Sequence, residues 1–323
     1  MSRTLLSLVA MLTRGAAMAD VPRVAVDIAP VHSLVARVME GVGTPDLILP
    51  PGASPHEYNL RPSEAGALQA ADLVFWIGPD LTPWMADAIA TLAGDAEVTA
   101  LLGAGGSLEL PFREGALFEG HGEDAGEDGD HGHDHGHDDD HGHDHGHDDD
   151  HGHGDHDPHV WLAPGNAAIW LDLIAGKLSA ADPENAGTYF VNAAAGRDEI
   201  AALTDEIEGI LAPVRGKRFI VFHDAYRYFE ESFDFPASGA ISLSDASDPS
   251  PARIAEILGR IAEQGIDCVL AEPQFNAALV ATVMDGSAAR TGVIDPLGSD
   301  LEPGPGLYGQ LMRNMATVLA GCL

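Results

Sequence analysis

Positive charge is scarce in this 323-residue chain, which has 16 Lys and Arg residues against 51 Asp and Glu residues and a formal net charge of −35 at pH 7. A chain with this charge repels polyanions, so nucleic acids and anionic lipid surfaces are not expected as partners. The electrostatic field favours cationic ligands instead. Because many exported proteins are acidic only for solubility, the charge does not identify a ligand by itself.

Long hydrophobic runs are also missing beyond the N-terminus, which carries the basic Arg3, an apolar run over 5–12 and the small-residue ending AMA. That run is too short to cross a bilayer, so an uncleaved membrane anchor is the weaker interpretation. The pattern is typical of an export signal over residues 1–19. It predicts that the mature protein is soluble and exported.

Cysteine is nearly absent, since only Cys268 and Cys322 occur in the chain. There is no CxxC spacing, so a thiolate zinc site is not expected. An exported protein folds in an oxidising compartment, which favours a disulfide between the two cysteines over the alternative of two free buried thiols.

Histidine, by contrast, is plentiful: 12 of the 16 histidines fall in residues 121–156, where the unit HGHDHGHDDD occurs twice in succession. Imidazole is a preferred ligand of zinc, copper and nickel, and aspartate is a harder ligand. The His/Asp-rich tract (119–157) is therefore expected to attract about three or four late divalent ions, at three to four ligands each. Its apolar residues are too few to offset the ordering entropy, so we expect a disordered insertion without metal. A solvated spacer is the alternative.

The body of the chain alternates short apolar runs with amphipathic stretches. This rhythm is typical of βαβ units and predicts an α/β fold with doubly wound parallel sheets, in which ligands bind beyond the carboxyl ends of the strands. In the first half, strands are expected over 23–28, 46–49 and 72–78, and helices over 30–40, 63–70, 81–92 and 164–178.

A long helical pattern follows, with Asp182 as the expected N-cap and Pro183 in the first helical position, and it continues to Leu211. Beyond it, strands are expected over 218–223, 268–271 and 293–295, and helices over 225–232, 250–264, 277–288 and from Tyr308 onward. We therefore predict two doubly wound α/β lobes joined by a long backbone helix, with a metal cleft between the lobes. The expected boundaries are a signal at 1–19, an N-terminal metal-binding lobe at 20–181, a linking helix at 182–214 and a C-terminal lobe at 215–323.

Four histidines lie outside the tract. His56 follows an apolar strand, His159 stands where the tract re-enters the folded body, and His223 ends the strand RFIVFH. Asp295 ends the expected strand GVID. These three histidines and Asp295 are expected at strand ends or in loops that face the cleft. The remaining histidine, His32, stands near a helix start without such a motif, so a capping or packing role is expected for it.

Six segments of the chain carry a family resemblance: GASPHEYNLRPSEAGALQAADLVFWIGP, DPHVWLAP, DPENAGTYFVNA, VFHDAYRYF, LAEPQFN and IDPLG. Together and in this order they resemble the periplasmic zinc-binding proteins of bacterial zinc-uptake ABC transporters, the ZnuA-like branch of the metal-binding cluster of solute-binding proteins. The resemblance implies that the protein binds Zn²⁺ as transported cargo and delivers it to an inner-membrane permease driven by an ATPase. We expect a monomer whose His-rich loop assists zinc acquisition.

The resemblance also implies that His56, His159 and His223 are the primary metal ligands. The fourth position is filled by a carboxylate or by water among such proteins, and Asp295 is the candidate here, with a turn-forming role as its alternative. Each imidazole needs an acceptor for its second nitrogen, for which Glu57, Asp224 or backbone carbonyls could serve.

The chemistry of this ligand set favours zinc independently of the resemblance. Three neutral imidazoles with one carboxylate or water form a tetrahedral shell that suits zinc, whereas manganese prefers more oxygen ligands. The same shell also describes a hydrolytic zinc centre. The chain has neither an HExxH motif nor another obvious general base, so we expect no enzymatic activity. A periplasmic zinc buffer that supplies other proteins is a further alternative.

Overall fold

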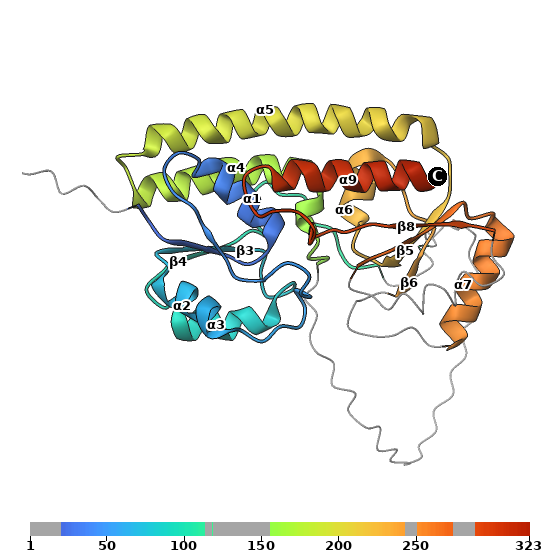
Figure 1. Ribbon diagram of the computed structural model, residues 1–323, viewed down its shortest axis with the longest axis horizontal. Helices are drawn as coiled ribbons and strands as arrows, with labels where there is room; N and C mark the ends of the chain where they lie inside the picture. The colour runs from blue at the N-terminus through green and yellow to red at the C-terminus, as the bar shows by residue number, and fades with distance from the viewer. Residues whose placement is uncertain (1–20, 114–117, 119–155, 243–250, 274–287) are drawn as a thin grey trace, which may run out of the picture.

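Two four-stranded parallel sheets form the two lobes of the chain (Figure 1). The computed structural model describes residues 21–113, 118, 156–242, 251–273 and 288–323. Three predictions lie outside the described residues. They are the export signal, the disorder of the His/Asp-rich tract, nearly all of which is undescribed, and almost all of the helix expected over 277–288. The predicted two-lobed α/β fold is confirmed.

The first sheet has the order β2-β1-β3-β4. Its strands are β1 (Val24–Val26), β2 (Asp46–Leu47), β3 (Leu73–Trp76) and β4 (Glu97–Ala100). Alternate residues of the two central strands enter different cores, because Val24 and Val26 pack with one cluster and Ala25 with another. Burial on both faces explains why β1 and β3 are continuous apolar runs. The edge strand β4 is mostly exposed and polar, so the apolar pattern missed it.

Helices cover both faces of this sheet (Figure 1). They are α1 (Ala29–Val38) on one face and α2 (Pro62–Ala70) and α3 (Pro83–Leu92) on the other. Each begins with a proline in its first turn, where the missing N–H has no intrahelical partner to lose.

The second sheet repeats the plan with the order β6-β5-β7-β8. Its strands are β5 (Phe219–His223), β6 (Ala240–Ser242), β7 (Cys268–Ala271) and β8 (Arg290–Val293), and its helices include α6 (Arg227–Phe233) and α7 (Pro251–Gln264). The sequence pattern did not predict β6, which has only three residues. It also placed the last strand at 293–295, whereas β8 covers Arg290–Val293, so the two share only Val293.

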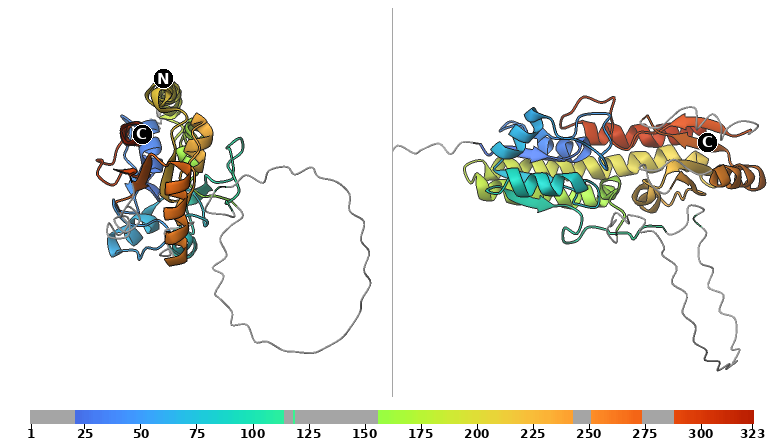
Figure 2. Two further views of the ribbon diagram at one scale, coloured as in Figure 1. Left: turned by 90° about the vertical axis from the view of Figure 1, so that its right-hand side faces the viewer. Right: turned by 90° about the horizontal axis from the view of Figure 1, so that it is seen from below.

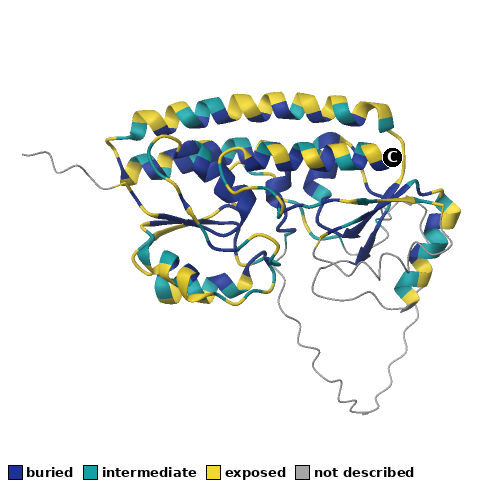
Figure 3. Cartoon of the chain, viewed as in Figure 1, coloured by how far each residue is buried: buried dark blue, intermediate teal, exposed yellow. Residues whose placement is uncertain are grey.

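A layer of long helices spans both lobes and includes α4 (Pro164–Ala181), α5 (Ala186–Leu211) and α9 (Leu307–Cys322). Helix α5 packs on α1, α4 and α9, and its outer face is exposed along its length (Figure 3). The helices approach closely at Gly196, where an added Cβ would lie 2.9 Å from the Leu171 side chain. The predicted long backbone helix is therefore present.

The start of α5 differs from the expectation. Asp182 is the C-cap residue of α4, and α5 begins at Ala186 with Asn185 as its N-cap. The Asp182 carboxylate accepts hydrogen bonds from the Asn185 side chain at 2.7 Å and from the Tyr189 hydroxyl at 2.9 Å. These bonds stabilise the turn between the two helices. The prediction that Asp182 is the N-cap of the long helix is therefore wrong. The predicted domain boundaries themselves stay predictions.

Helix α9 provides a second connection between the lobes that the sequence did not indicate. It lies beside α5 in two further views (Figure 2) and follows the second sheet in the chain. Its first turn nevertheless bonds to the first lobe: the Tyr308 N–H donates to Ser33 Oγ at 2.9 Å, and the Tyr308 hydroxyl donates to the Trp161 carbonyl at 3.0 Å.

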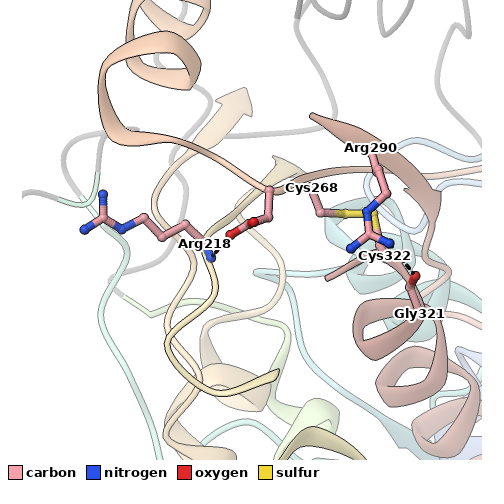
Figure 4. Close-up of a disulfide and its surroundings, with 6 residues drawn as sticks. Arg218, Cys268, Arg290, Gly321 and Cys322 are labelled. Atoms are coloured by element: carbon pink, nitrogen blue, oxygen red, sulfur yellow. Dashed lines mark hydrogen bonds between the residues drawn. A yellow bond between two sulfur atoms is a disulfide. The ribbon is translucent and has the colours of Figure 1, made fainter. Parts of the chain in front are cut away.

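The predicted disulfide is confirmed (Figure 4). It joins Cys268 of β7 to Cys322 at the end of α9, with Cα atoms 5.7 Å apart. It therefore anchors the second connecting helix to the centre of the second sheet. Among the described residues, no helix is both long enough and apolar enough to cross a membrane.

We predict that the Cys268→Ser, Cys322→Ser double variant loses about 4 kcal/mol of unfolding free energy, because the bridge closes a loop across 54 residues. Urea unfolding monitored by circular dichroism measures the change. Reduction of the unchanged protein should reproduce it, and identical midpoints for oxidised and reduced protein would contradict the prediction.

Candidate metal centre

Three histidines from distant parts of the chain gather at one hollow between the lobes. His56 lies in the loop between β2 and α2, His159 precedes the short 3-10 helix η1 (Val160–Leu162), and His223 ends β5. The ring centroid of His159 lies 5.7 Å from that of His56 and 5.3 Å from that of His223. The hollow has a volume of about 10 Å³, and its lining residues are Pro55, His56, His159, Trp161, His223, Pro296 and Leu297.

The spacing of the rings is close to that around a tetrahedral ion. Three imidazoles that bind one zinc at about 2.0–2.1 Å per nitrogen hold their ring centroids about 5.2 Å apart. The observed separations are slightly wider. Among the described residues, no group of three or more His, Cys, Asp or Glu side chains yet has the finished geometry of a metal site. Binding of one ion by all three rings stays a prediction.

His159 is held by the carboxylate two residues before it. Oδ1 of Asp157 accepts hydrogen bonds from the His159 backbone N–H at 3.0 Å and from its ring Nδ1 at 2.7 Å. Asp157 is buried, and burial raises its pKa to about 7, against the opposing effects of the His159 N–H and of the positive charge of Arg113. These contacts fix the orientation of the His159 ring.

His223 is held in the same way from the neighbouring strand. Its Nδ1 donates to Oε1 of Glu272 at 2.5 Å, and both side chains are buried. Glu272 directly follows β7, which pairs with β5, so the sheet itself places the carboxylate beside the imidazole. A ring that donates from Nδ1 carries its lone pair on Nε2, which leaves Nε2 as the nitrogen that could bind a metal.

His56 is more exposed than the other two histidines, and its loop is held at either side of it. Before it, the Trp84 indole N–H donates to the Pro55 carbonyl at 2.8 Å. After it, the Tyr58 hydroxyl donates to the Glu64 carboxylate, and the Tyr58 ring packs edge-on against Trp84. The loop is thus fixed at both ends while His56 itself is half-buried.

The two lobes are also joined directly at the hollow. The Trp161 indole N–H, from the first lobe, donates to the Pro296 carbonyl of the second lobe at 2.8 Å. The Trp161 ring lies 5.4 Å from the His159 ring. This bond places the second-lobe loop over the histidines.

Asp295 organises that loop. Its Oδ1 accepts hydrogen bonds from the backbone N–H groups of Leu297 and Gly298, and its Oδ2 accepts from the N–H and the hydroxyl of Ser299. Of this loop, Pro296 and Leu297 line the hollow and Asp295 does not. Ligation by Asp295 remains a prediction, and the described contacts are those of its turn-forming alternative.

The carboxylates behind the imidazoles differ from those considered from sequence. Glu57 is exposed, and Asp224 forms an ion pair with Arg113 at 2.8 Å. Asp157 and Glu272 fill the role instead. Both stand in the quoted segments DPHVWLAP and LAEPQFN, but only the pairing of β5 with β7 shows that Glu272 reaches a histidine.

His32 does not line the hollow. It is buried in α1, and its Nε2 lies 3.0 Å from the Pro45 carbonyl. Because a carbonyl only accepts, Nε2 carries the proton. Burial lowers the pKa of His32, in keeping with a neutral packed side chain.

Comparison with known proteins decides the family. The family described as zinc-uptake complex component A, periplasmic, matches residues 24–322. The chain belongs to this zinc-uptake component A family. The predicted resemblance is thereby confirmed.

Two relatives extend the match over nearly the whole chain. The high-affinity zinc uptake system protein ZnuA of Paracoccus denitrificans is 49% identical over 310 residues, covering 95% of this chain and 93% of the relative. The protein of the same name from Brucella abortus strain 2308 is 48% identical over 304 residues, covering 93% and 91%. A crystal structure of ZnuA shows the same fold, with a TM-score of 0.72 at 20% identity over 94% of this chain and 99% of that one.

We predict that metal-free protein at neutral pH carries the proton of His159 and His223 on Nδ1, because both rings donate to carboxylates from that nitrogen. Nitrogen-15 NMR of the imidazole rings distinguishes the two neutral tautomers. His32 is the internal control and should show the opposite tautomer, protonated on Nε2. An Nε2–H form at His159 or His223 would contradict the assigned arrangement.

Proposed function

We propose that this zinc-uptake component A family protein captures Zn²⁺ in the periplasm through His56, His159 and His223 and delivers it to an inner-membrane ABC permease driven by a cytoplasmic ATPase. One observation carries the proposal: imidazoles from both lobes surround one hollow, with ring centroids 5.3 and 5.7 Å apart. The relatives from Paracoccus denitrificans and Brucella abortus are both named as high-affinity zinc uptake system proteins.

Zinc suits the donor set better than manganese does. Zinc accepts three imidazoles and one further ligand in a tetrahedral shell, whereas manganese prefers more oxygen donors. The hydrogen bonds that His159 and His223 donate to Asp157 and Glu272 make the Nε2 lone pairs more basic. A related solved structure, a ZnuA deletion mutant, is described as having zinc bound.

Capture and release follow from the position of the ligands. His56 and His159 belong to the first lobe and His223 to the second, so an ion shared by all three links the lobes. Binding energy therefore favours a closed form, and movement of one lobe against the other weakens the shell. We propose that the permease promotes this movement, and that the protein acts as a monomer.

Binding without catalysis is the proposed activity. Asp157 and Glu272, the carboxylates that contact the ligand rings, each bond to a ring Nδ1 and orient it. In these positions they serve to position ligands, and a hydrolytic centre would need a base directed at substrate. Esterase or hydratase turnover by the zinc-loaded protein would favour the enzyme alternative.

We predict that His56→Ala, His159→Ala and His223→Ala each weaken the tight zinc site by more than about 100-fold, since loss of an outer-shell partner alone costs about 10- to 100-fold. Competition calorimetry with a zinc chelator measures the affinity.

The matched control is His32→Gln, whose side-chain amide can still donate to the Pro45 carbonyl and which should bind zinc as the unchanged protein does. Asp295→Asn separates the two roles of that residue: a loss as large as that of the histidine variants supports ligation, and a loss of thermal stability with near-normal affinity supports the turn. Unchanged affinity in all three histidine variants would refute the proposed site.

The His/Asp-rich tract is proposed to gather zinc and pass it to the hollow. Replacement of residues 119–155 by a short Gly-Ser linker should reduce the zinc stoichiometry to one per chain and leave the affinity of that last site unchanged. Calorimetric titration gives both values. If the tight site disappears with the tract, the assignment of the ligands to the three histidines is wrong.

A further inference from the structure

Residues 110 and 111, which precede the His/Asp-rich tract, are bound to residues 156 and 157 at its end. The Asp157 backbone N–H donates to the Leu110 carbonyl at 2.8 Å, and Pro111 and His156 form an isolated antiparallel bridge. Residues 108–113 and 156–159 thus form one joined base of the tract, which we call the tract root.

The tract root rests on helix α6 of the second lobe. The Tyr228 hydroxyl accepts a hydrogen bond from the Leu110 N–H at 2.8 Å and donates to the Asp157 carbonyl at 2.9 Å. The Arg227 guanidinium donates to the Pro111 carbonyl. A segment that leaves the first lobe is therefore held by the lobe that carries His223.

Arg113 makes the strongest contacts of the tract root. Its Nη1 lies 2.8 Å from Oδ1 of Asp224, and its Nη2 lies 2.7 Å from Oε2 of Glu230. The carboxylate side chains are only 6% and 3% exposed, and that of Arg113 is 18% exposed, so water screens these pairs weakly. The guanidinium also lies over the Phe118 ring at 3.8 Å.

The contact with Asp224 leads to a proposed metal ligand through one covalent step. Asp224 is the residue after His223. Asp157, whose carboxylate orients His159, also lies within the field of the Arg113 charge. Without the guanidinium, Asp224 and Glu230 would be buried carboxylates deprived of their main cationic partner, which is costly enough to drive rearrangement.

We propose that Arg113 is a positioning residue of the metal site, which holds His223 through Asp224 and fixes the tract root that contains Asp157 and His159. This inference rests on the proposed function of the three histidines. Ligands must be held within about 0.5 Å of their productive positions for tight binding, so loss of Arg113 should disturb coordination itself.

The test compares Arg113→Gln and Arg113→Lys with Arg313→Gln. Lysine keeps the positive charge but cannot bridge two carboxylates with a planar fork. Arg313 pairs with Glu206 on the exposed helical layer, so its variant matches the loss of an Arg–Glu pair away from the hollow. Zinc affinity is measured by chelator competition, and the visible absorption of the Co²⁺-loaded protein reports the coordination geometry.

We expect Arg113→Gln to weaken zinc binding by about 10- to 100-fold and to change the Co²⁺ spectrum, with Arg113→Lys in between. Arg313→Gln should leave both unchanged. A lower melting temperature with unaltered affinity and spectrum would show a merely structural role and overturn the inference. If Arg113→Gln does not fold, Arg113→Lys is judged by the same two readouts. Unchanged affinity in the histidine variants would instead refute the proposed function, whatever the Arg113 variants show.

Discussion

Two buried hydrogen bonds between imidazole and carboxylate, His159 with Asp157 and His223 with Glu272, are the interactions on which the site depends. Burying a carboxylate is costly unless it is paired, so each bond stabilises its acid and orients its histidine at once. The same requirement applies to Asp224 and Glu230, two buried acids that both pair with Arg113. Buried polar contacts therefore fix the orientation of the His159 and His223 rings.

The parallel sheets explain why these groups meet. His223 ends β5, Glu272 follows the adjacent β7, and His56 follows β2 of the other sheet. In doubly wound folds, such strand ends border the ligand crevice. Helices α5 and α9 then hold the two lobes together, and the Trp161–Pro296 bond and the tract root join them near the hollow. The proposed ion site thus lies where both lobes contribute side chains.

The sequence predicts those features that arise from local pattern or from quoted segments. Strands such as β5 and β7 are continuous apolar runs, and the four scattered histidines stand apart from the tract. It misses β4, which is a polar edge strand, and the α5 start, because Asp182 forms a turn that resembles an N-cap. It cannot show Glu272 behind His223, since 49 residues separate them and only strand pairing brings them together. Asp295 illustrates the same limit, because its contacts with the following loop depend on backbone direction after β8.

The central claim is that imidazoles from both lobes bind one ion in the hollow. The most direct test is zinc X-ray absorption of the protein with 119–155 replaced by a Gly-Ser linker and loaded with one equivalent of zinc, because this replacement removes 11 of the 12 tract histidines. The account predicts a four-coordinate shell with three imidazole nitrogens at about 2.0–2.1 Å. A six-coordinate shell of oxygen ligands, or one with a single imidazole, would contradict it.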